Sequence, residues 1–276
     1  MKSITYLALL LLLAAPVTAQ ITRDQLPPEK ASQISDAQLE LTNWMMFYYK
    51  KPLPDDFPRW LKSASAEGML KDEKRQFPFL GFAATVFAAN SGKIPQWMRT
   101  INALPKQDRK TVLIALWLSG TKASQDAISV KPRKKLLRGR NYFNFRTRRE
   151  PPSLDGINVC YGGFLDIQWG RFLASGSEKP IKNVISILEL AQFVGSRQKY
   201  TKPKGEKEKQ AVLKEAIFRS AIWSLRSNCQ MHPEVLTICE QIYKEGKLSR
   251  LARLSLKSIL IELKPEKYKI DGASNN

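Results

Sequence analysis

Residues 211–245 read AVLKEAIFRSAIWSLRSNCQMHPEVLTICEQIYKE, and this stretch decides the fold class. Apolar side chains recur every three or four positions, the spacing expected of helices that are buried along one side. Pro233 marks the start of the second helix, because its fixed φ suits the first helical position and its missing N–H is not needed there. So short a connection predicts two antiparallel helices with a shared core. The expected stripe consists of Leu213, Ile217, Phe218, Ala221, Ile222 and Leu225, followed by Val235, Ile238, Cys239 and Ile242.

The same pattern occurs at two other places in the chain. A bulky apolar residue precedes a helix-starting proline by eight positions in the pairs Phe87 and Pro95, Phe172 and Pro180, and Leu225 and Pro233. Residues 77–90, FPFLGFAATVFAAN, are apolar almost all round, which predicts a central helix. The chain is therefore expected to be all-α. We expect stacked antiparallel helical hairpins, as in an α–α superhelix or a TPR- or HEAT-like solenoid.

Polar residues mark where other helices are expected to start. Asp36 is expected to cap a helix that runs through Tyr48, and Ser124 a short helix that runs through Ile128. The last predicted helix covers residues 248–263 and ends at Pro265. Its basic side chains are expected on the outer side and its apolar ones elsewhere. The basic set is Arg250, Arg253 and Lys257, and the apolar set is Leu251, Ala252, Leu254 and Ile259.

The N-terminus has the pattern of a secretory signal peptide. Lys2 provides a positive start, residues 4–15 form an apolar run, and Pro16 breaks it. Small residues at Val17 and Ala19 fit a cleavage site after position 19. The run is shorter than the roughly 20 residues that a spanning helix needs. We expect a soluble exported protein, periplasmic or secreted, with an uncleaved N-terminal anchor as the alternative.

Composition shifts divide the chain into segments. The expected segments are a signal peptide (1–19), an extended lead-in (20–35), N-terminal helical hairpins (36–130), a basic insert (131–155), C-terminal helical hairpins (156–264) and a tail (265–276). The chain has 276 residues, enough for one large domain or two modest ones. Its formal charge of +20 favours contact with polyanions, or else reflects a solvated basic surface.

The basic insert is the candidate binding segment. Residues 131–149, KPRKKLLRGRNYFNFRTRR, contain nine basic residues and no acidic one. Charges interleaved with aromatic rings are typical of strips that bind anionic polymers. A solvated loop, or an aromatic anchor tucked onto the core, explains the same residues. The polyanion-binding candidates are Arg133, Lys134, Lys135, Arg138, Arg140, Tyr142, Phe143, Phe145, Arg146, Arg148 and Arg149, with help from the exposed loop expected at 197–209.

The sequence offers little for catalysis or metal binding. His232 is the only histidine, and its place before Pro233 indicates a turn or capping role. No HExxH or CxxC spacing is present, so we expect no metal, no cofactor and no catalytic residue. Asp166 stands out, because it falls in an otherwise apolar helix. A buried carboxylate needs a partner, and Arg171 or Lys182 could form an ion pair with it.

Three cysteines are present, and export permits a disulfide between two of them. In an antiparallel hairpin, Cys229 and Cys239 would be offset by about 9 Å along the helix axes, beyond disulfide reach. A bond from Cys160 to either of them stays open. We favour buried apolar thiols.

Three blocks carry a resemblance to a known group of proteins. FPFLGFAATVFAAN at 77–90, LDIQWGRFLASGSEKPIKNVI at 165–185 and AIWSLRSNCQMHPEVLTIC at 221–239 resemble the core of an uncharacterised family of exported bacterial all-helical proteins. The resemblance implies export and an all-helical fold, and it implies no activity. The insert at 131–149 is where this chain departs most from that family.

Three functions fit these observations. The first is a non-enzymatic exported scaffold that binds another protein or an envelope component. The second is a binder of anionic polymers, such as lipopolysaccharide, another anionic glycan or nucleic acid, through the basic insert. The third is a cell-wall glycan hydrolase that uses Asp166. The sequence gives no basis for naming the partner or the oligomeric state.

Overall fold

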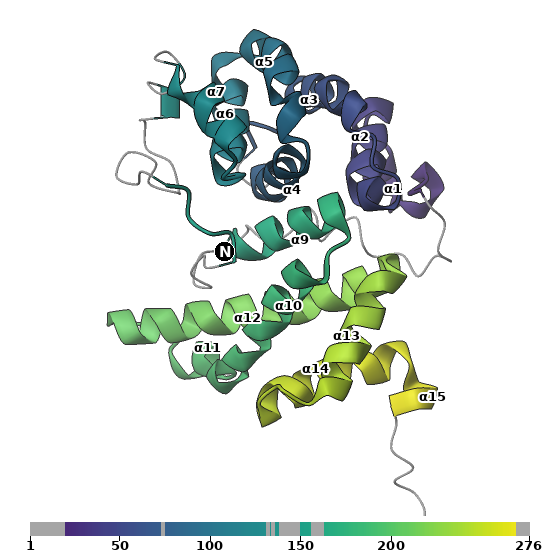
Figure 1. Cartoon of the computed structure of the whole chain (residues 1–276). Helices are drawn as coiled ribbons and strands as arrows, with labels where there is room; N and C mark the ends of the chain where they lie inside the picture. Colours follow the sequence, from purple (N-terminus) through teal and green to yellow (C-terminus); the bar gives the residue numbers. More distant parts are fainter. Residues whose placement is uncertain are drawn as a thin grey trace, which may run out of the picture. The chain divides into compact units, whose positions relative to one another are not determined.

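The computed structural model of the chain describes residues 20–72, 75–130, 133, 136–137, 150–155 and 163–268. All regular structure in these ranges is helical, which confirms the predicted all-α class (Figure 1). The signal peptide, most of the basic insert, Cys160 and the end of the tail lie outside the described residues. The chain divides into two compact units, and part of the first unit follows the insert in sequence. Residues 1–157 and 166–177 belong to the first unit, and residues 158–165 and 178–276 to the second.

The first unit contains the helices on either side of the insert. In order they are η2 (Arg23–Gln25), α1 (Pro28–Ala31), α2 (Asp36–Phe47), η3 (Tyr48–Lys50), η4 (Pro54–Asp56), α3 (Phe57–Ala66), α4 (Gln76–Ala89), η5 (Ser91–Lys93), α5 (Ile94–Ala103), α6 (Lys106–Leu118), α7 (Lys122–Ser129) and α9 (Phe164–Ser175, from Asp166 on). The expected lead-in is thus partly helical, with Ile21 and Leu26 buried.

The core of the first unit forms around α4. This helix is buried on nearly every side, as its uniformly apolar sequence predicts. Phe57 packs edge-on against Phe87 of α4, with ring centroids 5.2 Å apart, and lies 5.1 Å from the ring of Trp97 on α5. Such aromatic contacts contribute beyond the area they bury. Helix α6 packs along α4 as well.

Helices α4 and α9 approach so closely that only glycine fits between them. A Cβ atom on Gly81 would lie 2.1 Å from the carbonyl oxygen of Ile167, and one on Gly170 would lie 1.9 Å from that of Pro78. Each glycine thus faces the backbone of the other helix. The contact places α9 against α4, although the two helices are far apart in sequence.

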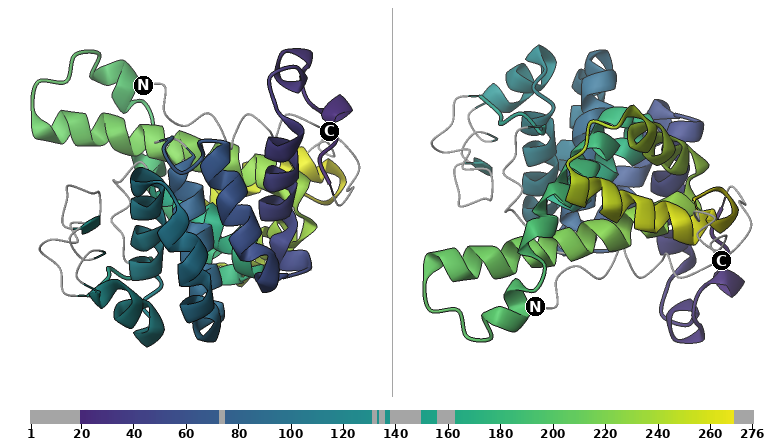
Figure 2. Two further views of the ribbon diagram at one scale, coloured as in Figure 1. Left: turned by 90° about the horizontal axis from the view of Figure 1, so that it is seen from above. Right: turned by 90° about the horizontal axis from the view of Figure 1, so that it is seen from below.

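The second unit contains the remaining helices. They are α10 (Glu178–Ser186), η6 (Ile187–Phe193), α11 (Ser196–Lys199), α12 (Glu206–Met231), α13 (Pro233–Glu245), α14 (Arg250–Leu263) and α15 (Pro265–Tyr268). The view from below in Figure 2 shows α14 running beside α12, and η6 packs against both helices. Leu188, Leu225, Val235 and Leu256 are fully buried where these elements meet.

Two ends of the second unit differ from what the sequence predicts. Residues 197–209 are not only a loop, because they include most of α11 and the first turn of α12. The expected tail begins with α15, whose Tyr268 is buried. Leu213 is 36% exposed, so it does not belong to the buried stripe of α12 as predicted.

The predicted helix starts are correct to within a few residues, but two predicted caps are wrong. Ser35, rather than Asp36, caps α2 by accepting a hydrogen bond from the Gln38 N–H. Thr121 caps α7 by accepting from the N–H of Ser124. In both cases a hydroxyl on the N-terminal side of the predicted cap accepts from a free N–H group of the first turn, from the residue directly before Asp36 and from the residue three before Ser124.

Candidate interaction surfaces and buried polar groups

Helix α14 combines a buried face with an unusual exposed one. Ser249 caps the helix by accepting a hydrogen bond from the Ala252 N–H at 3.3 Å. Leu251 and Leu254 are 47% and 53% exposed. We expected these leucines away from the basic side chains, and that prediction was wrong. The buried positions are Ala252, Leu256, Ile259 and Leu260.

The exposed leucines lie among basic side chains. Arg250 and Arg253 are exposed and Lys257 is half-buried. The Arg253 guanidinium lies 5.0 Å from the ring centroid of Tyr243, a cation–π contact that leaves its charge unneutralised. Within the part of the chain that the structure describes, no carboxylate forms an ion pair with these three cations. We call the set Arg250, Leu251, Arg253, Leu254 and Lys257 the α14 face.

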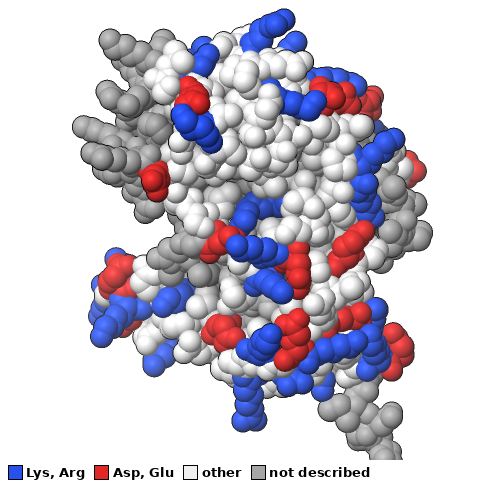
Figure 3. Space-filling view, in the orientation of Figure 1, with Lys and Arg blue, Asp and Glu red and all other residues white. Residues whose placement is uncertain are grey.

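Charge elsewhere is mixed. On the side drawn in Figure 3, acidic side chains lie among the basic ones. Ion pairs in the second unit include Lys182 with Glu178 at 2.8 Å and Arg226 with Glu262 at 2.8 Å. The surplus of positive charge therefore does not by itself define a binding surface. The α14 face differs because its cations form no such pair with any described residue and border exposed leucines.

The predicted polyanion strip is represented by a single described cation, Arg133. Its guanidinium donates hydrogen bonds to the carbonyl oxygen of Ala127 at 2.7 Å and to Oδ1 of Asn102 at 3.2 Å. It thus helps satisfy the carboxyl end of α7 and links α7 to α5. The remaining strip candidates lie outside the described residues, namely Lys134, Lys135, Arg138, Arg140, Tyr142, Phe143, Phe145, Arg146, Arg148 and Arg149.

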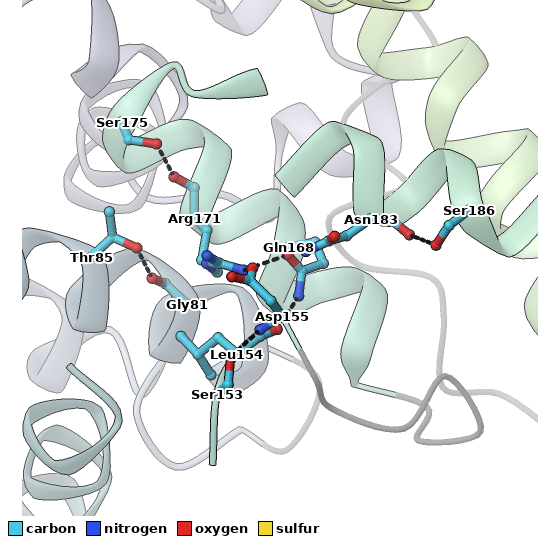
Figure 4. Close-up of polar contacts among 10 residues, drawn as sticks. All are labelled: Gly81, Thr85, Ser153, Leu154, Asp155, Gln168, Arg171, Ser175, Asn183 and Ser186. Atoms are coloured by element: carbon cyan, nitrogen blue, oxygen red, sulfur yellow. Dashed lines mark hydrogen bonds and ion pairs between the residues drawn. The ribbon is translucent and has the colours of Figure 1, made fainter. Parts of the chain in front are cut away.

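Asp166 is a half-buried carboxyl group in the first turn of α9. Burial raises its pKa to about 7. Among the described residues, Asp166 forms no ion pair with Arg171, one of its two predicted partners. Arg171 binds Asp155 at 2.7 Å and Gln168 at 2.8 Å (Figure 4), and Lys182 binds Glu178. Asp166 and Arg171 are five residues apart, which at about 100° per residue puts them roughly 140° apart around the helix.

The Asp155–Arg171 pair stabilises the segment that leads toward α9. The Gln168 side chain donates to the carbonyl oxygen of Leu154 at 2.8 Å, so both α9 side chains hold residues 154–155 (Figure 4). The Asp155 carboxylate therefore has a structural role as the partner of Arg171. A glycosidase needs two carboxyl groups that flank one bond. Among the described residues, no second carboxylate is shown to be paired with Asp166 in this way.

Glu215 is a buried carboxylate that the sequence did not single out. Its oxygens accept hydrogen bonds from the Arg197 backbone N–H at 2.7 Å and from Nε of Arg219 at 2.8 Å. The Arg197 N–H lowers the pKa of Glu215 most, against the opposing effect of burial, with further lowering from Arg219. Glu215 thus ties α11 to α12. Its i, i+4 spacing to Arg219 was the available signal.

A second charged cluster attaches α15. Oε1 of Glu240 accepts hydrogen bonds from Lys267 at 2.7 Å, Lys264 at 3.1 Å and the Tyr268 hydroxyl at 3.1 Å. Burial of Glu240 opposes its ionisation, but hydrogen bonds from Lys267, Lys264 and Tyr268 outweigh burial and hold the pKa at about 2. The cluster fastens the end of the described chain to α13.

His232 is fully buried and is the only residue between α12 and α13. Its position at the turn is as predicted, but its side chain makes no capping hydrogen bond. A one-residue junction is shorter than the two to five residues of an αα-hairpin loop. The prediction that Cys229 and Cys239 are too far apart assumed such a hairpin, and it was wrong. Their sulfur atoms lie 3.7 Å apart.

The described residues contain no group of three or more His, Cys, Asp or Glu side chains placed to hold a metal ion. Among them, no helix combines the length and the apolar character that crossing a bilayer requires.

Comparison with family models, curated proteins and solved structures finds no match for this chain. The family resemblance described above therefore depends only on the three quoted blocks.

Proposed function

We propose that the protein is an exported helical scaffold that binds an anionic membrane surface of the cell envelope through the α14 face. In this proposal the helices stack as hairpins or corners and hold that face outward. The observation that carries it is the exposure of Leu251 and Leu254 beside three cations that have no acidic partner among the described residues.

The composition of the α14 face favours a lipid surface over a soluble polyanion. Arginines and lysines attract anionic headgroups, and leucines next to them can enter the boundary between headgroups and acyl chains. A soluble polymer would use the charges alone and leave the leucines in water. The Arg253 guanidinium packs over the ring of Tyr243, and this contact holds the charge of Arg253 close to α13.

The expected strength is modest and can be divided between charge and apolar contact. Each basic residue near an anionic bilayer contributes about 1 kcal/mol. Arg250→Gln together with Arg253→Gln should therefore weaken binding roughly 30-fold. Leu251→Ser together with Leu254→Ser should weaken it by a similar amount, because a buried leucine contributes about 1.5–3 kcal/mol and these would be only partly buried.

The test is co-sedimentation of residues 20–276 with vesicles of phosphatidylglycerol and phosphatidylcholine, compared with phosphatidylcholine alone. Lys62→Gln with Lys106→Gln is the matched control, because it removes two exposed charges from the first unit. Binding should require phosphatidylglycerol, fall with salt, and drop in both α14 variants but not in the control. Equal binding by the wild type and both variants would rule the proposal out.

Binding of anionic polymers through the basic insert is the second candidate, and heparin is the probe that separates it. Loss of heparin binding in a variant with Arg146, Arg148 and Arg149 changed to Gln, with vesicle binding retained, would assign the insert its own ligand. The hydrolase candidate predicts soluble sugar release from peptidoglycan, lost in Asp166→Asn. No specific observation in the described residues favours it.

A further inference from the structure

We infer that Cys229 and Cys239 form a disulfide bond that fixes the corner between α12 and α13. The two residues come from different helices of the second unit, and their sulfur atoms lie 3.7 Å apart. A disulfide needs about 2.05 Å, so each sulfur has to move less than about 1 Å. Rotation about the Cα–Cβ bond of each cysteine moves its sulfur atom and leaves the backbone in place.

The surroundings suit a structural bond rather than a reactive thiol. Cys229 is 3% exposed and Cys239 is fully buried. The contact with Cys239, together with burial, raises the pKa of Cys229, so the thiol stays protonated in the folded chain. Bond formation therefore belongs to the folding stage, while the two thiols are still accessible. Once the helices have packed, the bond is shielded from reductants.

The chemistry is thiol–disulfide exchange with a disulfide-bearing oxidant, such as oxidised glutathione or a disulfide-donating protein. The thiolate of one cysteine attacks a sulfur of the oxidant and releases one thiolate. The second cysteine then attacks the mixed disulfide and releases the other. Two protons leave the cysteines and two thiols form on the oxidant, so the exchange balances. Export would supply such an oxidant in the cell.

The sequence permits a direct measurement on the unmodified chain. Trypsin cleaves after Arg226 and Lys244, with no Lys or Arg between them, so one peptide contains both cysteines and excludes Cys160. Residues 20–276 are refolded with reduced and oxidised glutathione and alkylated in denaturant without reductant. The chain is then digested with trypsin, and the peptide masses are measured by mass spectrometry. We expect peptide 227–244 to be unalkylated and two hydrogens lighter than its reduced form. Reduction before alkylation should then add two labels.

Three results would overturn the inference. One is peptide 227–244 alkylated at both cysteines, and another is its linkage to the peptide that contains Cys160. The third is a bonded refolded chain whose native counterpart, isolated from its own envelope, contains free thiols at both positions. The refolding experiment does not depend on membrane binding, so its outcome is separate from that of the vesicle test. A Cys239→Ser variant cannot form the bond, so its Cys229 should be alkylated. Proteolysis of the folded variant should be at least severalfold faster than that of the folded wild type.

Discussion

Replacing Gly170 by alanine should destabilise the first unit, although alanine is the better helix former. In Gly170→Ala the new Cβ would lie 1.9 Å from the Pro78 carbonyl oxygen, 2.8 Å from the Phe82 nitrogen and 2.9 Å from the Pro78 carbonyl carbon. All three are backbone atoms, so no side chain can turn away. An ordinary contact of about 3.4 Å requires α9 to retreat from α4 by roughly 1.5 Å.

The magnitude follows from two opposing contributions. Overpacking of a core costs about 1–3 kcal/mol, and sometimes more. Alanine returns about 1 kcal/mol through its higher helix propensity. The retreat of α9 would loosen the packing of Ile167, Trp169 and Phe172, which are all at least 98% buried. Subtracting the propensity gain from the overpacking cost leaves a net loss of about 0–2 kcal/mol. We expect a loss near the upper end, about 2 kcal/mol, because the new Cβ meets only backbone atoms.

The assay is urea unfolding followed by circular dichroism and tryptophan fluorescence. Gly92→Ala serves as the control, because apart from its own local backbone no atom of the described residues lies within 4 Å of the added Cβ. Its free energy of unfolding should change by less than about 0.5 kcal/mol. If Gly170→Ala were as stable as the wild type or more so, the close approach of α4 and α9 would be refuted. Gly81→Ala, which meets the Ile167 carbonyl oxygen at 2.1 Å, should behave like Gly170→Ala.

Three further predictions concern carboxyl groups that are half-buried or buried, and they are checked by unfolding at several pH values. Asp166→Asn should stabilise the chain by about 1–3 kcal/mol at pH 8 and change little at pH 4, because the folded pKa of about 7 exceeds the ordinary 3.8 and the cost of ionisation appears only as pH rises between them. Glu240→Gln should cost about 1–3 kcal/mol at pH 7 and speed proteolysis near α15; the contribution of Glu240 is complete above about pH 4.5 and disappears as pH falls toward 2. Glu215→Gln should cost about 1–3 kcal/mol at pH 7 and increase amide exchange in α11, and its pKa shift is likewise downward, so this loss should shrink in acid. An Asp166→Asn chain no more stable at pH 8, or unchanged unfolding in either glutamate variant, would contradict the corresponding contact.

Sequence patterns predicted the helices well because local periodicity and proline positions determine them. Residues 77–90 were apolar on all sides, and the corresponding α4 is buried as expected. Pro95, Pro180 and Pro233 all lie in the first turns of helices, as the spacing predicts. The interactions behind these predictions involve residues close in sequence.

Contacts between distant segments could not be read from the same patterns. The pairing of Gly81 with the α9 backbone depends on how two helices cross, and a glycine within an apolar helix gives no sign of its partner. The proximity of Cys229 and Cys239 depends on the one-residue junction at His232, which the sequence suggested was a longer turn. The exposed leucines of α14 were missed because RLARLSLKSILIEL has leucines on more than one side of the helix.

The fit of α9 against α4 has a consequence for synthesis. Translation produces α4 long before α9, because the insert and its flanking residues separate them. In a nascent chain that has not reached residue 177, the side of the apolar helix α4 that carries Gly81 is therefore not yet covered by α9. Such a surface favours association with a chaperone on the ribosome or with other unfinished chains. Shortened fragments that end in the insert should accordingly be poorly soluble, whereas chains that continue through α9 can close their first unit.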